Sequence, residues 1–198
     1  MVDGTVYAVP KNWGTTGIAF NSDKTGGPVD SWKTFFDGAR DQFDGRVMVH
    51  DYQLTTIGNA LVYHGFSFNS VDPEELAQAE KLLIDVKPHL YAISSDYQPA
   101  MRNGDAWLTM CWTGDGKQLN VDMPEIGFAL GKEGGEIWSD YYAIPKDAPH
   151  KDAAYALINY LLDPEVNARE ALDALEFGAA VTLTDPNRAE LMARFKSA

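Results

Sequence analysis

The sequence predicts an α/β protein in which a largely parallel sheet is flanked by helices. Short apolar runs rich in β-forming residues alternate along the chain with longer segments of helical periodicity. The helical segments carry clear start and stop signals. The 198 residues are 45% hydrophobic and 23% charged, as in an ordinary globular protein, and are enough to bury a sizeable core.

Short runs of β-branched and aromatic residues bounded by turn-forming residues are expected as strands. Trp13 stands between the first two of them, where Gly14 and Gly17 allow a bend. We expect Trp13 either to line a cleft or to pack at a hinge. The expected strands are residues 6–9, 17–20, 46–50, 90–93, 107–112, 126–129 and 141–144.

The sequence signals for helices are clearer than those for strands. In the segment DPEE (72–75), Asp72 can cap a helix, Pro73 suits its first turn and Glu75 completes a capping-box spacing. That helix should run to about Lys87, because Pro88 stops it. The same start signal recurs at residues 163–165 and 185–187, and two further helices are expected at 55–64 and 151–162.

The charge balance narrows the classes of partner. A formal net charge of −13 argues against nucleic acid, whose phosphates would be repelled, and would attract a cationic partner. The same acidity is also compatible with a role in solubility alone. Cys111 is the single cysteine, so the chain has no internal disulfide, and its apolar surroundings predict a buried, inert thiol.

Membrane and export signals are not visible in this sequence. No run approaches the ~20 apolar residues of a membrane span. The N-terminus lacks the basic and apolar segments of a signal peptide. Either the protein is cytoplasmic, or this N-terminus is not the natural one.

Common catalytic and metal-binding motifs are missing from the sequence. None of the four histidines has the spacing of a transition-metal site, and Gly131-Lys132 lacks the rest of a phosphate-binding loop. No nucleophile elbow of the Gly-x-Ser-x-Gly type is present. With 29 acidic residues, pairs of carboxylates arise by chance. We therefore expect no enzyme activity, no cofactor and no metal.

The positive signal is an aromatic and acidic segment, EIWSDYY (136–142). On a strand, residues i and i+2 share a face, so Trp138 and Asp140 should point the same way. A carboxylate can bind an ammonium group, and an indole face can hold the adjacent methylenes with a cation–π contribution of ~0.5–2 kcal/mol. The pair suits an aliphatic amine. The alternative is that Trp138 is a core residue and Asp140 a turn residue.

Two other expected strands end in residues of the same kind. Trp112 ends an apolar strand, at the edge where ligands bind α/β sheets, and it is either a wall of a site or a core residue. Asp51 follows the strand 46–50 and supplies either a second carboxylate or, as we favour, a cap for the next helix.

Taken together, several segments resemble the extracytoplasmic solute-binding proteins of polyamine ABC transporters, the spermidine/putrescine-binding family. The resemblance covers residues 4 to about 178, and KEGGEIWSDYYAIP (132–145) is its most specific part. The other segments are VPKNWGTTGIAFN (9–21), DSWKTFFD (30–37), FDGRVMVHD (43–51), WLTMCWTGD (107–115) and KDAAYALINYLLDPEV (151–166).

The resemblance implies roles for individual residues. Trp138 would be a hydrophobic wall of the ligand channel, Asp140 would anchor a ligand ammonium group, and Trp112 would stack on the methylene chain. Phe177 falls where relatives often have a tyrosine, so the ring is kept without its hydroxyl.

The resemblance also links the acidic residues near position 51 to the choice between spermidine and putrescine. Spermidine binders tend to have two acids spaced by three in this region, where this sequence has Tyr52 and Thr55. Asp51 lies one position earlier, closer to the putrescine-type pattern.

The resemblance also implies the organisation of the chain. The fold would be periplasmic-binding-protein-like (type II) with an incomplete second lobe. Residues 1–16 would be a strand and crossover of the first lobe, 17–138 the second lobe, 139–175 a first-lobe strand and helices, and 176–198 a return to the second lobe. The chain would be a piece of a longer periplasmic protein that docks on a membrane permease. An apolar stripe on helix 151–162 would then be exposed and drive dimerisation.

Three other functions remain open from the residues themselves. The same fold could bind a different small cationic, amino-acid-like or opine-like solute, which Thr55 in place of an acid favours. A hydrolase with paired carboxylates would require Asp140 to face another acid at a fixed short distance. The last alternative is a truncated product without activity.

Overall fold

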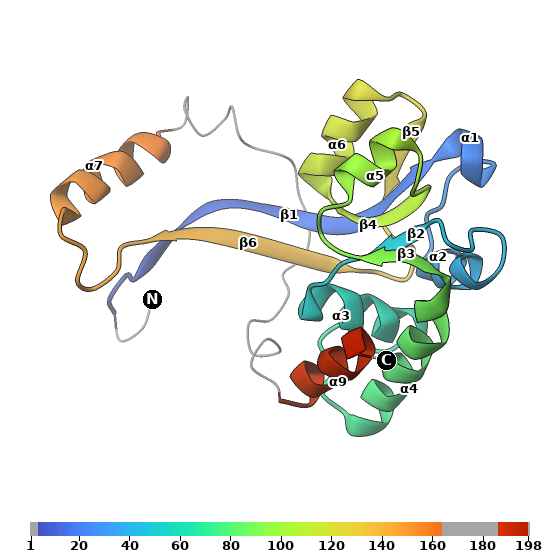
Figure 1. Cartoon of the computed structure of the whole chain (residues 1–198). Helices are drawn as coiled ribbons and strands as arrows, with labels where there is room; N and C mark the ends of the chain where they lie inside the picture. The colour runs from blue at the N-terminus through green and yellow to red at the C-terminus, as the bar shows by residue number, and fades with distance from the viewer. Residues whose placement is uncertain (1–3, 164–185, 198) are drawn as a thin grey trace. The chain divides into compact units, whose positions relative to one another are not determined.

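The computed structural model describes residues 4–163 and 186–197 (Figure 1). The chain divides into two compact units, each built from segments far apart in sequence. Among the described residues, unit 1 comprises 4–14 and 137–163, and unit 2 comprises 15–136 and 186–197. That these units belong to two lobes of a longer protein stays a prediction. No described helix has the length and apolar character needed to cross a membrane.

The sheet combines parallel and antiparallel strands. β2 pairs in parallel with β3 and β4, whereas β1 runs antiparallel to both β4 and β5. The α/β class is thus confirmed, but the sheet is mixed and not largely parallel. Alternation of strands and helices did not reveal the direction of β1. The order is β3 (Leu90–Ile93), β2 (Val47–Val49), β4 (Leu108–Trp112), β1 (Ala8–Asn21) and β5 (Ile126–Ala129).

β1 is one continuous strand of 14 residues, so the expected bend at Trp13 between two short strands is wrong. Gly14 and Gly17 do not form a bend. They let neighbouring groups come close to the backbone of β1. A Cβ on Gly14 would lie 2.5 Å from ring carbon Cζ2 of Trp138, and one on Gly17 would lie 2.5 Å from the carbonyl oxygen of Ala129. A residue with a side chain would displace these neighbours.

β6 (Glu136–Ala143) pairs with β1 and starts five residues before the expected strand at 141–144. Trp138 and Asp140 therefore both lie inside a strand, as the argument for a shared face requires. Glu136 and Ile137 at the start of β6 are buried, while Asp140 is exposed.

The expected helices at 55–64 and 72 to about 87, and the start signal at 185–187, correspond to helices of unit 2 that begin at Gln53, Pro73 and Pro186. The Asp72 carboxylate accepts hydrogen bonds from the backbone N–H groups of Glu74 (2.9 Å) and Glu75 (3.2 Å), as the capping signal predicted. The helix it caps gives way to a 3₁₀ turn, Lys87–His89. The helices are α1 (Ser22–Thr25), α2 (Trp32–Arg40), α3 (Gln53–Tyr63), α4 (Pro73–Val86), α5 (Gln98–Asn103), α6 (Thr113–Asp122) and α9 (Pro186–Ser197).

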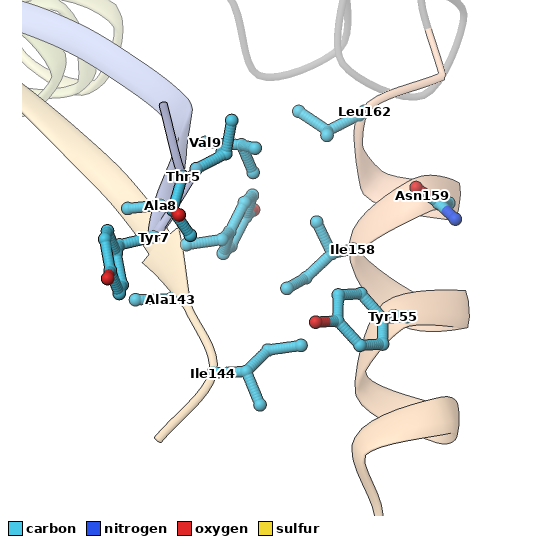
Figure 2. A pocket seen from close by; sticks show the side chains of 12 residues that line it. Thr5, Tyr7, Ala8, Val9, Ala143, Ile144, Tyr155, Ile158, Asn159 and Leu162 are labelled. Carbon is cyan, nitrogen blue, oxygen red and sulfur yellow. The ribbon is translucent and has the colours of Figure 1, made fainter. Parts of the chain in front are cut away.

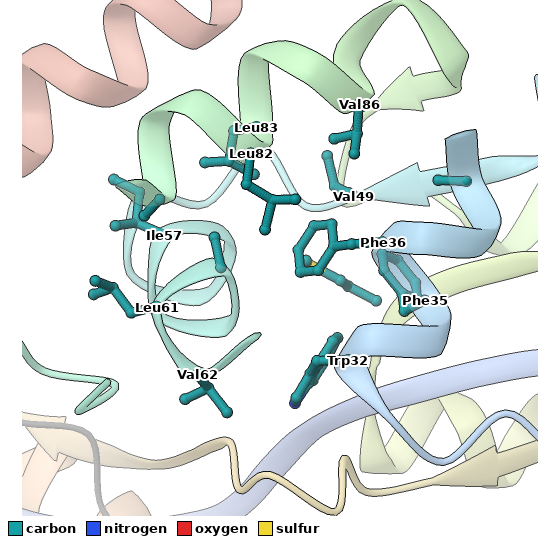
Figure 3. Close-up of a cluster of buried hydrophobic side chains, with 14 of the residues drawn as sticks. Trp32, Phe35, Phe36, Val49, Ile57, Leu61, Val62, Leu82, Leu83 and Val86 are labelled. Atoms are coloured by element: carbon teal, nitrogen blue, oxygen red, sulfur yellow. The ribbon is translucent and has the colours of Figure 1, made fainter. Parts of the chain in front are cut away.

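Helices cover both faces of the sheet in unit 2. On one face, aromatic residues of α2 meet apolar residues of α3 and α4, and α9 packs against the same two helices (Figure 3). Trp32 and Phe35 contact edge to face at 5.6 Å, and both are fully buried. A smaller apolar cluster includes Tyr97, Met101 and Cys111. Cys111 is buried as predicted, and this burial raises the pKa of its thiol to about 12.

The described part of unit 1 consists of the outer ends of β1 and β6 together with α7 (Lys151–Leu161). A pocket of about 440 Å³ lies within it. Tyr155, Ile158 and Leu162 face Val9 and Ile144 across this pocket (Figure 2). No residue of α7 is buried.

Candidate functional site

The carboxyl ends of three parallel strands bring together a set of polar and aromatic residues in unit 2. Asp51 follows β2, Ser95 follows β3, and Trp112 is the last residue of β4. The Ser95 hydroxyl donates a hydrogen bond to the Asp51 carboxylate, which shows that the ends of β2 and β3 meet. That hydrogen bond lowers the pKa of Asp51, so this exposed carboxylate is charged at neutral pH. Such an edge is where α/β sheets bind ligands.

Three aromatic side chains, those of His50, Tyr97 and Trp112, pack together at this edge. The imidazole ring of His50 stacks on the ring of Tyr97 with centroids 5.4 Å apart and an interplanar angle of 9°. The other neighbour of His50 is the indole of Trp112, at 4.9 Å. Trp112 is half-buried, so part of its ring is held by the cluster while part remains accessible. This placement is compatible with the predicted stacking role of Trp112.

Burial of His50 lowers its pKa to about 4, against an effect in the opposite direction from Asp51 and Asp115. The imidazole is therefore neutral at physiological pH. A neutral ring beside this edge leaves the surrounding carboxylates free to attract a cation without repulsion from a histidine charge.

A further carboxylate of this edge, Asp115, was missed by the sequence reasoning. The Tyr97 hydroxyl donates a 2.7 Å hydrogen bond to Oδ2 of Asp115 and accepts one of 3.1 Å from the backbone N–H of Trp112. Asp115 lies in the first turn of α6, three residues after Trp112. An acid in the first turn of a helix that begins at a strand end was the available signal.

Unit 1 holds the other predicted site residues that the structure describes. The Trp138 ring lies against Gly14, and its Nε1 atom is buried with no hydrogen-bond partner among the described residues. Asp140 is exposed two residues further along β6, and Trp13 is half-buried on β1. Phe177 lies outside the described residues. The roles of these residues in binding stay predictions.

A buried carboxylate at the start of β6 is the second feature that the sequence reasoning missed. Oε2 of Glu136 accepts hydrogen bonds from the hydroxyl groups of Thr16 on β1 (2.7 Å) and Thr55 on α3 (2.6 Å). Burial raises the pKa of Glu136, while these two hydrogen bonds and the charge of the buried Arg188 lower it. Thr55 thus supports a buried acid and is itself fully buried. The partners are 120 and 81 residues apart in sequence, so no local pattern signals them.

Groups of three metal-ligating side chains do not occur within the described ranges. The edge of unit 2 carries two carboxylates, those of Asp51 and Asp115. It also carries the half-exposed indole of Trp112 and the buried phenol of Tyr97. Carboxylates next to aromatic faces can hold a cationic organic solute. The fold and this edge define a solute-binding α/β protein.

Comparison with known proteins places the chain more closely. Residues 1–184 match the model of the bacterial extracellular solute-binding protein family, and the chain belongs to that family. It is 35% identical over 184 residues to a putrescine/agmatine-binding protein of Pseudomonas aeruginosa (84% of this chain, 49% of the relative). It is 33% identical over 178 residues to the putrescine-binding periplasmic protein PotF of Escherichia coli (82% and 48%).

Solved structures share the fold. A protein of Listeria monocytogenes, described as a putative spermidine/putrescine ABC transporter, superposes with a TM-score of 0.80 at 22% identity, covering 96% of this chain and 69% of that protein. The chain spans about half the length of the curated relatives it matches.

Proposed function

We propose that the chain is part of an extracytoplasmic solute-binding component of an ABC transporter, with polyamines such as putrescine or spermidine as its ligands. The observation that carries this proposal is the edge of unit 2, where Asp51 follows β2 and Asp115 follows the half-exposed Trp112 at the end of β4. The family assignment and the names of the relatives support it. The protein would bind its solute without transforming it and deliver it to a membrane permease.

The chemistry of the edge suits an aliphatic diamine. An ammonium group would form charge-assisted hydrogen bonds to Asp115 or Asp51, and the methylenes would lie on the indole of Trp112. The net charge of −13 would attract the cation from a distance. The neutral state of His50 avoids an opposing charge at this place.

Trp138 and Asp140 would also bind the solute, and Trp13 and Phe177 would be further aromatic residues of the binding site. We propose that the complete protein closes two lobes around its solute, because a ligand that contacts both lobes favours the closed arrangement. This chain carries only part of those contacts. The chain alone would then bind weakly, with a dissociation constant of ~1 mM or above, which corresponds to about −4 kcal/mol.

Titration calorimetry on the complete protein that contains this chain tests the proposal. The ligands are putrescine, spermidine, arginine and γ-aminobutyrate, which separate a polyamine from an amino-acid-like solute. The Asp140→Ala variant should weaken polyamine binding by ~2 kcal/mol or more, as expected when a charge pair that ligand binding buries loses one partner. Asp147→Ala, which removes an exposed acid from the same unit, is the matched control. Absence of polyamine binding would overturn the ligand assignment, and indifference to Asp140→Ala would overturn the role of Asp140.

A hydrolase with paired carboxylates is the alternative of another class. It would require Asp140 to face another acid at a fixed short distance.

A further inference from the structure

Tyr97 connects the aromatic and the acidic residues at the edge of unit 2. Its side chain is fully buried, so it cannot itself contact a ligand from solvent. Its hydroxyl accepts a hydrogen bond from the Trp112 backbone N–H and donates one to Asp115. A phenol has a single proton to donate, and here that proton goes to the carboxylate.

The surroundings of Tyr97 keep that proton in place. Burial raises the pKa of its hydroxyl far above the ordinary value of 10, so the group stays a donor at any physiological pH. The ring is fixed by its stacked contact with His50 and by an edge contact with Trp112 at 6.1 Å. The phenol therefore has one orientation, and the hydroxyl points at one place.

Because the Tyr97 hydroxyl has one orientation, it holds the Asp115 carboxylate in one orientation as well. An acid in the first turn of a helix can otherwise turn toward the helix's own N-terminal N–H groups. The bond from Tyr97 goes to Oδ2 alone, and Oδ1 takes no part in it. Asp115 is only partly exposed, and the indole that ends β4 lies three residues before it.

We propose that Tyr97 is a positioning residue for solute binding, which orients the Asp115 carboxylate and the Trp112 backbone so that a ligand ammonium group meets Oδ1 of Asp115 while its methylenes lie on the indole. This inference rests on the proposed function, because it concerns the same edge. It adds a buried residue that acts on affinity through Asp115 and touches no ligand atom.

A double-mutant cycle on the complete protein that contains this chain separates this role from a general structural one. Putrescine affinity is measured for the unchanged protein and for Tyr97→Phe, Asp115→Asn and the double variant. Tyr97→Phe keeps the ring and should weaken binding about tenfold, in line with the loss of a hydrogen bond to a charged group. In the Asp115→Asn background the same change should weaken binding less than about twofold.

Tyr91→Phe is the matched control, because the Tyr91 hydroxyl also donates to a carboxylate, that of Asp105, at an exposed place. It should leave putrescine affinity unchanged. Effects of Tyr97→Phe and Asp115→Asn that simply add would overturn the positioning role while leaving the proposed function intact. Failure of the unchanged protein to bind any of the amines would instead overturn the proposed function, and this inference with it.

A second measurement keeps the proposal testable if Tyr97→Phe does not fold. The hydroxyl proton of Tyr97 should give a slowly exchanging NMR signal in the unchanged 198-residue chain. Asp115→Asn, which alters the acceptor and leaves Tyr97 in place, should shift that signal or broaden it. A signal indifferent to Asp115→Asn would show that the hydroxyl donates elsewhere, which contradicts the proposal.

Discussion

The hydroxyl group of Thr55 on α3 donates a 2.6 Å hydrogen bond to the buried carboxylate of Glu136 on β6. Thr16 on β1 donates to the same oxygen, so two strands and a helix meet at one acid. A buried carboxylate is unfavourable unless donors surround it. This arrangement ties the stability of unit 2 to the protonation state of Glu136.

Thr55→Val should therefore destabilise the chain in a pH-dependent way. Loss of one donor to a buried carboxylate costs about 1–3 kcal/mol at pH 7. The folded-state pKa of Glu136 is raised above its ordinary value of 4.5. The stabilisation that comes from this raised pKa is therefore present below pH 4.5 and is lost as pH rises through the folded-state value.

Thr55→Val raises the folded-state pKa of Glu136 further, so the cost of the substitution should shrink between pH 7 and pH 5. Urea unfolding at the two pH values measures it. Thr34→Val, an exposed threonine on α2, is the control and should change little. An equal cost of Thr55→Val at both pH values would contradict the link to Glu136.

Gly14→Ala should disturb Trp138. The added Cβ would lie 2.5 Å from the indole ring, a distance that forces the ring or the strand to move. Overpacking of this kind costs about 1–3 kcal/mol, and the tryptophan fluorescence should change with it. Gly135→Ala is the control, since its Cβ would meet neighbours no closer than 3.5 Å. Equal unfolding free energies for the two variants would show that the contact with Trp138 is not restrictive.

Acid should destabilise unit 2 through His50. Its folded-state pKa is about 4 against an ordinary 6.5, so the unfolded chain binds the proton more readily. Stability is then highest above pH 6.5 and falls as pH decreases toward 4, by up to about 3 kcal/mol from this residue. His50→Phe preserves the stacked ring and should flatten this part of the pH profile. His150→Gln, at an exposed histidine, should not. Chemical unfolding across pH 4–7 measures the difference, and identical profiles for all three proteins would refute it.

The exposed face of α7 should drive self-association of the isolated chain. Leu157 is 58% exposed and Tyr160 is 63% exposed, and the same helix lines the pocket of unit 1. Apolar surface of this kind favours burial against a second copy. Light scattering should show a mass that grows with concentration, and Leu157→Lys should abolish the growth. Val121→Lys, at an exposed valine on α6, is the control. A monomer at every concentration would contradict the expectation.

Local signals were enough to predict much of the framework. Asp72 was predicted as a cap because its partners are two and three residues away, and the buried state of Cys111 follows from its apolar neighbours. Trp112 was identified because the end of an apolar strand can be read directly from the sequence.

Contacts between distant segments could not be predicted in this way. Gly14 and Gly17 indicated a bend because a glycine that permits close approach looks the same in sequence as one that permits a turn. The placement of Asp115 at the edge of unit 2 depends on its contact with Tyr97, which lies 18 positions earlier. The buried state of the Glu136 carboxylate was not predicted, because both of its hydrogen-bond donors lie far away in the sequence.

The position of α9 in the core has a consequence for how the chain folds during synthesis. Leu191, Met192 and Phe195 complete the apolar cluster beside α3 and α4, yet the whole of residues 137–163 is translated before them. Unit 2 cannot complete this cluster until α9 has been translated. Contacts between such distant segments slow folding. Apolar surface stays exposed to solvent during that time. The faces of α3 and α4 that α9 covers therefore stay exposed in the nascent chain until that point.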